Sequence, residues 1–218
     1  MSSSLKVSRS LEFSQDLEPF VELKFPVRGQ QLPADHGYGL FAAFVHLIPE
    51  LRQQQDISIL TIPGFGDRQG KILLTQQSCC RIRVPISKIS LVYQLAGKLF
   101  WVGKHQIHLG IPQITPLEST HQLRARIVTI KGYEEADPFL RAAKRQLDAL
   151  GIGGEITIPQ NRKGQLSRKT IKIKHYTVVG FSLEITGLTD EHSLTLQRYG
   201  CGGKRHMGCG IFLPYSHD

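Results

Sequence analysis

Residues 200–214 read GCGGKRHMGCGIFLP, a glycine-rich loop that passes directly into a short apolar strand. Glycine adopts backbone conformations closed to other residues and lets a ligand approach the main chain closely. Cationic side chains stand between the glycines, so the loop predicts a site for a polyanion, to which free backbone N–H groups would add. The residues expected to form this site are Gly202, Gly203, Lys204, Arg205, His206 and Gly208.

The residues before this loop follow a pattern of strands and helices. Residues 121–131, HQLRARIVTIK, alternate apolar and polar side chains as a half-buried strand does. Residues 137–150, DPFLRAAKRQLDAL, predict a helix with Asp137 as its N-cap, Pro138 in its first turn and Gly151 beyond its end. Further strands are predicted over 155–159, 170–174 and 177–185, and a helix over 189–200, capped by Thr189 or Asp190.

The first half of the chain repeats this order. Residues 17–27 alternate as a strand does, and residues 36–51, HGYGLFAAFVHLIPEL, have apolar side chains at helical spacing. Asp35 stands where an N-cap carboxylate would accept the free N–H groups of that helix. The segment GFGDRQG (64–70) predicts a turn. The remaining elements are strands predicted over 57–62, 71–75, 80–86 and 105–110, and a short helix over 87–98.

Each half therefore reads strand–helix–strand twice, which is the ferredoxin-like order. We predict an α+β protein made of two tandem ferredoxin-like (RRM-like) βαββαβ domains, covering residues 1–112 and 113–218. The segment 111–118, IPQITPLE, contains two prolines and is predicted to join the domains.

Composition narrows the class of partner and the compartment. Lys and Arg outnumber Asp and Glu by 27 to 18, and this balance favours an anionic partner, most often nucleic acid. No run of 18 apolar residues occurs, which predicts no membrane span, and the opening MSSSLKVSRS lacks the apolar core of a signal peptide. The four cysteines fit no usual zinc spacing. We therefore expect reduced thiols, a cytoplasmic location, and no metal or other cofactor.

A second basic segment precedes the last predicted helix. Residues 160–176, QNRKGQLSRKTIKIKHY, contain no acid, and strand alternation places Lys172 and Lys174 on one face, opposite Ile171 and Ile173. Cations about 7 Å apart match successive phosphates of a nucleic acid, although a hairpin with a solvated basic face is the alternative. Its coincidence with the glycine-rich loop favours RNA or DNA. The expected RNA-binding residues here are Arg162, Lys163, Arg168, Lys169, Lys172 and Lys174.

Several nucleotide-binding motifs are excluded by the residues that follow the loop. A Walker loop needs Lys-Ser or Lys-Thr after its last glycine and then a helix, whereas Cys209 and a strand follow Gly208. A dinucleotide fingerprint fails because no helix N-terminus follows the loop. The aromatic signature of the RNA-recognition motif is also missing. What remains is a clamp of backbone and cations on phosphates.

The loop GGKRHMGCGIF, at the end of a second ferredoxin-like half, resembles the signature loop of CRISPR repeat-processing endoribonucleases, the Cas six family of the RAMP superfamily. DHGYGLF (35–41), IVTIKGYEEADPFLRAAKRQLDALGI (127–152) and VVGFSLEITGLTDEHSLTLQRYGCGGKRHMGCG (178–210) resemble its myxobacterial-type type I branch. The resemblance spans nearly the whole chain. It implies a protein that binds CRISPR repeat RNA and cuts precursor CRISPR RNA within repeats without a metal, making mature guide RNAs.

The resemblance also implies the chemistry and its residues. Such cleavage uses the ribose 2′-hydroxyl as nucleophile and leaves a 2′,3′-cyclic phosphate and a 5′-hydroxyl. It requires a base, an acid and donors for the developing charge, and histidine suits either proton role. His36 occupies the position at which related enzymes carry a histidine, at the start of the first predicted helix, where we expect loop backbone to expose it. Tyr38 is expected to donate a hydrogen bond to the scissile phosphate.

Two other functions stay open at the level of sequence. The first is a non-catalytic RAMP-type subunit that holds RNA within a CRISPR effector complex, because a fold does not fix a function. The second is a general basic RNA chaperone, which would bind with steep salt dependence and little preference for repeat RNA. The segment DHGY favours the enzyme. Other effector-complex subunits are possible partners in either case.

Overall fold

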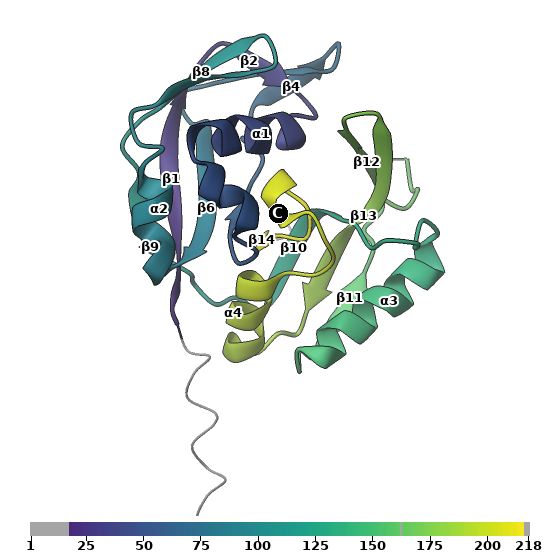
Figure 1. Cartoon of the computed structure of the whole chain (residues 1–218). Helices are drawn as coiled ribbons and strands as arrows, with labels where there is room; N and C mark the ends of the chain where they lie inside the picture. The colour runs from purple at the N-terminus through teal and green to yellow at the C-terminus, as the bar shows by residue number, and fades with distance from the viewer. Residues whose placement is uncertain (1–17, 162, 216–218) are drawn as a thin grey trace, which may run out of the picture.

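The computed structural model describes residues 18–161 and 163–215, so the opening segment MSSSLKVSRS and Arg162 lie outside the described residues. Two antiparallel sheets, one from each half of the chain, lie side by side (Figure 1). The first helix and the glycine-rich loop lie between them in this view. The prediction of an α+β fold with two tandem ferredoxin-like domains is confirmed.

The N-terminal domain has the strand order β3-β6-β1-β8-β7, with β9 paired to the other part of β1. A small second sheet, β2-β5-β4, extends from it. Short 3-10 turns cover Pro49–Gln53 and Ile86–Lys88. The elements are β1 (Phe20–Arg28), β2 (Gln31–Pro33), α1 (Gly37–Leu47), β3 (Ser58–Ile59), β4 (Phe65–Arg68), β5 (Lys71–Leu73), β6 (Cys79–Pro85), α2 (Ile89–Tyr93), β7 (Leu99–Val102), β8 (His105–Leu109) and β9 (Gln113–Pro116).

The C-terminal domain has the order β11-β13-β10-β14, which is the ferredoxin-like arrangement of two interleaved strand–helix–strand units. The long strand β13 extends beyond its pairing with β10 and forms a hairpin with β12, which is the fifth strand of this sheet. The elements are β10 (Gln122–Val128), α3 (Ala136–Ala149), β11 (Glu155–Thr157), β12 (Arg168–Ile173), β13 (Tyr176–Thr186), α4 (Asp190–Tyr199), a 3-10 turn (Arg205–Met207) and β14 (Phe212–Pro214).

Each sheet buries one face under its helices. In the N-terminal domain, alternate residues of β1 are buried, and Phe44 of α1 packs edge-on against Phe100 of β7 with centroids 5.3 Å apart. In the C-terminal domain, the ring of Phe139 of α3 packs against that of Phe181 of β13, with centroids 4.9 Å apart. The strand alternation and helical spacing that predicted these elements therefore arise from burial of one face.

Several boundaries differ from the predictions. GFGDRQG, predicted as a turn, contributes the strand β4, and the predicted strand 57–62 is reduced to β3. The strand β7 was not predicted. The predicted linker 111–118 contains β9, whose pairing with β1 extends the N-terminal sheet beyond the expected division between residues 112 and 113. Non-local pairing decides these short strands, and a local pattern carries little information about it.

Helix caps were predicted with mixed success. The Thr189 side chain accepts a hydrogen bond from the His192 N–H, as an N-cap should, and Gly200 ends α4 with a positive φ of 65°. The N-cap of α3 is Glu135 rather than Asp137, which lies in the first turn. The prediction that Asp35 caps α1 is wrong, because its carboxylate instead accepts a hydrogen bond from the Lys172 N–H of β12 (2.6 Å).

A buried arginine joins the two domains. Arg83 of β6 has 1% of its surface exposed and donates hydrogen bonds to the carbonyls of Gln197 (2.7 Å) and Phe212 (3.1 Å) in the C-terminal domain. Its Nη2 donates to the Glu22 carboxylate (3.3 Å), which also pairs with Arg81. The orientation of the two domains is therefore set partly by directed polar contacts.

Candidate functional site

The glycine-rich loop is closed by its own backbone. Cys201 N–H donates to the Gly210 carbonyl (3.1 Å), Gly210 N–H to Ile127 (2.8 Å) and Gly203 N–H to Thr129 (2.9 Å). A Cβ on Gly200 would overlap the Gly210 carbonyl, so only glycine permits the two ends of the loop to approach this closely. The expectation of free N–H groups is wrong for these positions, because their hydrogen bonds are made within the protein.

Arg205 and His206 turn toward the N-terminal domain. The Arg205 guanidinium donates to the carbonyls of Arg198 (3.1 Å) and Gln55, and the His206 ring bonds through Nε2 to the Gln54 carbonyl. The His206 ring also stacks on Phe41 of α1, with centroids 4.8 Å apart and planes 7° apart. These two side chains hold the loop against the first domain, which corrects the view of both as groups presented to RNA.

Lys204 remains available to an anion. It is exposed, adopts a left-handed conformation (φ 64°), and makes no side-chain hydrogen bond or ion pair with any described residue. It lines a groove of about 580 Å³ with Lys131, Gly202 and Gly203. Of the loop residues predicted to bind RNA, these glycines and Lys204 are the ones that face such a groove, whereas Gly208 packs close to Thr61.

The basic hairpin has the predicted character along most of its length. Arg168, Lys169 and Lys172 are exposed on β12, whereas Ile171 is buried. Lys163 is exposed in the loop before this strand. The prediction that Lys174 shares a strand face with Lys172 is wrong: Lys174 lies in the tight turn after β12, with a positive φ of 53°.

His36 is the N-cap residue of α1, and only 2% of its surface is exposed. Its Nδ1 lies 2.8 Å from the Pro33 carbonyl, and its Nε2 accepts a hydrogen bond from the Ile62 N–H (2.9 Å). A carbonyl only accepts and an amide N–H only donates, so these partners fix the neutral tautomer with the proton on Nδ1. Burial lowers the pKa of His36, against the opposing effect of the bond to Pro33. The expectation that loop backbone exposes this ring is wrong.

Charged side chains act electrostatically on His36 and on the nearby Cys209 thiol. The positive charge of Arg126, exposed on β10, acts on both His36 and the Cys209 thiol. The charges of Lys204 and Asp35 also act on Cys209, whose pKa is raised by burial to about 11. We call Asp35, His36, Arg126, Lys204 and Cys209 the seam cluster, because it lies where α1, β10 and the glycine-rich loop meet.

Arg126 and Lys131 were missed at the level of sequence. The alternation in HQLRARIVTIK places Arg126 on the face opposite Ala125 and Ile127, which was a usable signal for an exposed cation. Tyr38 is half-buried on α1, and its hydrogen bond to the scissile phosphate stays a prediction.

Among residues 18–161 and 163–215, no group of three or more His, Cys, Asp or Glu side chains is arranged to hold a metal ion. All four cysteines are free thiols. No helix within the described residues has the length and apolar character needed to span a lipid bilayer.

Comparison with known proteins identifies the family. The model of the family described as Cas6 Crispr matches residues 21–217. A CRISPR-associated endonuclease Cas6 from Myxococcus xanthus is 36% identical over 199 residues, which cover 91% of this chain and 83% of the relative. The chain belongs to the Cas6 family.

Solved structures show the same fold at low sequence identity. A structure described as CRISPR associated protein Cas6 is 11% identical, with a TM-score of 0.62, covering 91% of this chain and 99% of the other. A Cas6-related protein from Pyrococcus furiosus is 12% identical, with a TM-score of 0.63 and coverage of 89% and 97%. The structure of an RAMP protein described as binding different RNA substrates is 11% identical, with a TM-score of 0.55, covering 89% of this chain and 98% of the other.

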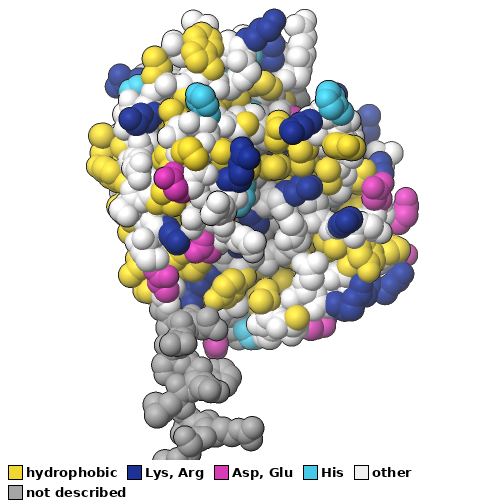
Figure 2. Space-filling model, viewed as in Figure 1, with side chains coloured by type: hydrophobic (Ala, Val, Ile, Leu, Met, Phe, Trp, Pro, Cys, Tyr) yellow, Lys and Arg dark blue, Asp and Glu magenta, His cyan; other side chains and the backbone are white. Residues whose placement is uncertain are grey.

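The face that carries the Cas6 seam cluster is rich in cations. Figure 2 shows several Lys and Arg side chains over the middle and right of this face, where α1 lies opposite the β12–β13 hairpin. The bond between Asp35 and the Lys172 N–H ties this hairpin to the start of α1. The basic hairpin, the glycine-rich loop and His36 thus adjoin one another across the seam between the two domains.

Proposed function

We propose that this Cas6-family protein is a metal-independent endoribonuclease that binds CRISPR repeat RNA and cleaves precursor CRISPR RNA within its repeats. The observation that carries the proposal is the seam cluster beside the basic hairpin, in which the charge of Arg126 acts on His36 and the charges of Arg126 and Lys204 act on Cys209. The name of the Myxococcus xanthus relative, an endonuclease, supports the same activity.

In the proposed reaction the ribose 2′-hydroxyl attacks the adjacent phosphorus. The 2′-oxygen gives its proton to a base as it bonds to phosphorus, and the P–O5′ bond breaks as the 5′-oxygen of the next nucleotide receives a proton from an acid. The products are a 2′,3′-cyclic phosphate and a 5′-hydroxyl. His36 serves one of the two proton transfers, and Arg126 and Lys204 stabilise the charge that develops on the phosphorane. Tyr38 donates a hydrogen bond to the scissile phosphate.

His36 must change a hydrogen bond to take part. Its Nε2 is the unprotonated nitrogen, and it accepts the Ile62 N–H. To receive a proton from RNA, Nε2 has to exchange this partner for the ribose hydroxyl. Leaving a buried N–H unpaired costs about 1–3 kcal/mol, an amount that RNA binding along the seam can offset.

The RNA path follows the exposed cations of the C-terminal domain. Lys163, Arg168, Lys169 and Lys172 contact phosphates along the hairpin, and Lys204 contacts them at the groove beside the loop. Mature guide RNA then remains bound or passes to other subunits of a CRISPR effector complex. We infer a cytoplasmic location, which the four free thiols support.

A second candidate function rests on the same histidine. Because both His36 ring nitrogens are bonded within the protein and the ring is buried, a non-catalytic RAMP-type subunit that only binds RNA also suits this geometry. The two functions differ in one measurement, which is whether repeat RNA is cut.

The test is incubation of the purified protein with end-labelled repeat RNA in EDTA, with the chemistry of both product ends determined. We expect His36→Ala and Arg126→Ala to bind RNA but to cleave at least 100-fold more slowly. Arg126 is exposed, so its variant should unfold at the wild-type temperature even if His36→Ala loses stability. Tight RNA binding with no product at any pH would establish the non-catalytic subunit, and wild-type rates in both variants would overturn the assigned roles.

A further inference from the structure

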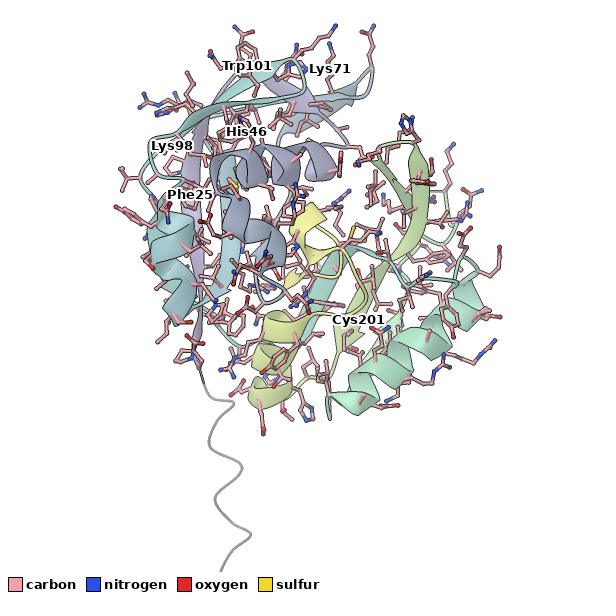
Figure 3. All side chains as sticks on the ribbon, viewed as in Figure 1. Phe25, His46, Lys71, Lys98, Trp101 and Cys201 are labelled. Atoms are coloured by element: carbon pink, nitrogen blue, oxygen red, sulfur yellow. The ribbon has the colours of Figure 1, made fainter. Side chains whose placement is uncertain are left out.

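The N-terminal sheet carries a second surface suited to nucleic acid, away from the seam cluster. The edge strand β7 alternates exposed and buried residues: Phe100 and Val102 are buried under α1, whereas Leu99 and Trp101 project from the opposite face and are 56% and 59% exposed. Figure 3 shows Trp101 at the end of the molecule that also carries Lys71. An indole this exposed on a sheet face is an available stacking surface.

Strand register assembles polar groups around these two side chains. Directly opposite residues of antiparallel strands project from the same face. His108 of β8 lies opposite Leu99 and also opposite Arg28 of β1, so these three side chains form a row across the sheet. Gln106 lies opposite Trp101 in the adjacent row. We call this surface the β7–β8 platform; its residues are Arg28, Leu99, Trp101, Lys104, Gln106 and His108.

The platform adjoins a groove of about 590 Å³. Arg28, Lys104, His105 and His108 line this groove, and none of its lining residues is acidic. Within the described part of the chain, the side chains of Arg28, Lys104 and Gln106 make no hydrogen bond or ion pair. Unpaired cationic donors, with no acidic side chain among the lining residues, suit this groove to a polyanion.

We propose that the β7–β8 platform binds a single-stranded segment of RNA, with one base stacked on Trp101 and its phosphates held by Arg28 and Lys104. Stacking on an aromatic side chain requires a base that is not paired or stacked in a duplex, and this requirement selects single strands. In the context of the proposed function, on which this assignment rests, the segment is the part of the precursor that flanks the cleavage site.

The groove is close enough to His36 for one RNA to reach both. Gln31 at the start of β2 lines the groove, and β2 ends at Pro33, whose carbonyl bonds to the His36 ring. The five residue-to-residue steps from Gln31 to His36 span at most roughly 18 Å even if fully extended. A strand leaving the seam can therefore continue along β2 to the platform.

Trp101 is the single tryptophan of the chain, so its fluorescence reports on the platform alone. We expect an oligouridylate of about 12 nucleotides, within the size range of single-strand sites, to quench this fluorescence. In anisotropy titrations with labelled RNA, Trp101→Ala should weaken binding roughly 5- to 150-fold, the effect of losing one stacked base, and Trp101→Phe should restore most of it. Arg28→Gln and Lys104→Gln should each lower the slope of log K against log salt by about 0.7.

Tyr93→Ala is the matched control, because it removes an exposed aromatic ring from α2, outside the platform, and should keep wild-type affinity. Tyr93→Ala should also cleave repeat RNA at the wild-type rate, whereas Trp101→Ala should need a higher RNA concentration to reach half-maximal cleavage. Absence of quenching, or equal RNA affinity of Trp101→Ala and wild type, would overturn the proposal that the platform binds RNA. If the platform fails this test but the wild-type protein cuts repeat RNA, the proposed function stands. If RNA quenches Trp101 fluorescence but the wild-type protein does not cut repeat RNA, only the proposed function is rejected.

Discussion

Gly37 is a residue at which the first helix and the glycine-rich loop lie in close contact. It is the first residue of α1, directly after His36, and a Cβ at this position would overlap the Met207 carbonyl. Backbone cannot move aside as a flexible side chain can. The absence of a side chain at Gly37 therefore lets the loop lie against the start of the helix that carries the proposed catalytic histidine.

This contact reverses the usual effect of replacing glycine in a helix. Alanine normally stabilises a helix interior by roughly 1 kcal/mol relative to glycine. We expect Gly37→Ala instead to destabilise the protein by about 1–3 kcal/mol, the range for overpacking, and to slow RNA cleavage by displacing the loop. Gly39→Ala is the control, because its Cβ would meet only the Val102 side chain, at 3.2 Å. Urea unfolding gives the free energy of unfolding of both variants, and equal values for Gly37→Ala and Gly39→Ala would contradict the proposed overlap with Met207.

At the scale of elements, the glycine-rich loop is a docking device as well as a candidate RNA contact. Its 3-10 turn inserts Arg205 and His206 between α1 and the segment that follows it, where both bond to backbone carbonyls. The loop thereby fixes the position of Lys204, the cation that remains exposed beside the groove. Docking and anion binding are thus divided among adjacent residues of one loop.

This docking predicts a pH-dependent stability. Burial lowers the pKa of His206 below the value near 6.5 of an unfolded histidine, and burial lowers the pKa of His36 in the same direction. The unfolded chain therefore binds more protons below about pH 6.5, so the free energy of unfolding falls as the pH drops through that value and is retained above it. Urea unfolding between about pH 7.5 and 5 should show this fall, and His206→Gln should reduce its slope. Parallel profiles would contradict the role of His206.

The sequence predicted those parts of these elements that depend on local chemistry. Periodicity identified all the long strands and helices, Gly200 and Thr189 were recognised as caps, and the glycine-rich loop was placed correctly between α4 and β14. The roles of Arg205 and His206 were not predictable, because their partner carbonyls lie 150 and 152 residues away along the chain. The burial of His36 has the same origin, since its partner Ile62 lies 26 residues away along the chain, in the loop between β3 and β4.

At the scale of the whole molecule, the two domains are joined by a polar network as well as by the loop. Glu22 of β1 is buried and pairs with Arg81 and Arg83 of the neighbouring strand β6. Arg83 then extends to the ends of α4 and β14, and burial lowers its pKa to about 10, against the opposing charge of Glu22. The relative position of the seam residues therefore depends partly on one buried guanidinium.

Arg83→Ala should separate the contribution of this network from that of an ordinary ion pair. It leaves two buried carbonyls without donors and removes one partner of a buried pair, so we expect a loss of about 3–5 kcal/mol in the free energy of unfolding. Arg81→Ala is the matched control, because it removes the other cation bound to Glu22. The Arg81 side chain is 27% exposed, and its hydrogen bonds to Glu22 stay within the N-terminal domain. Its loss should be near 1 kcal/mol. Denaturant unfolding gives both values, and small-angle scattering reports whether Arg83→Ala loosens the domains. Equal losses would show that the interdomain bonds of Arg83 add nothing to the pairing with Glu22.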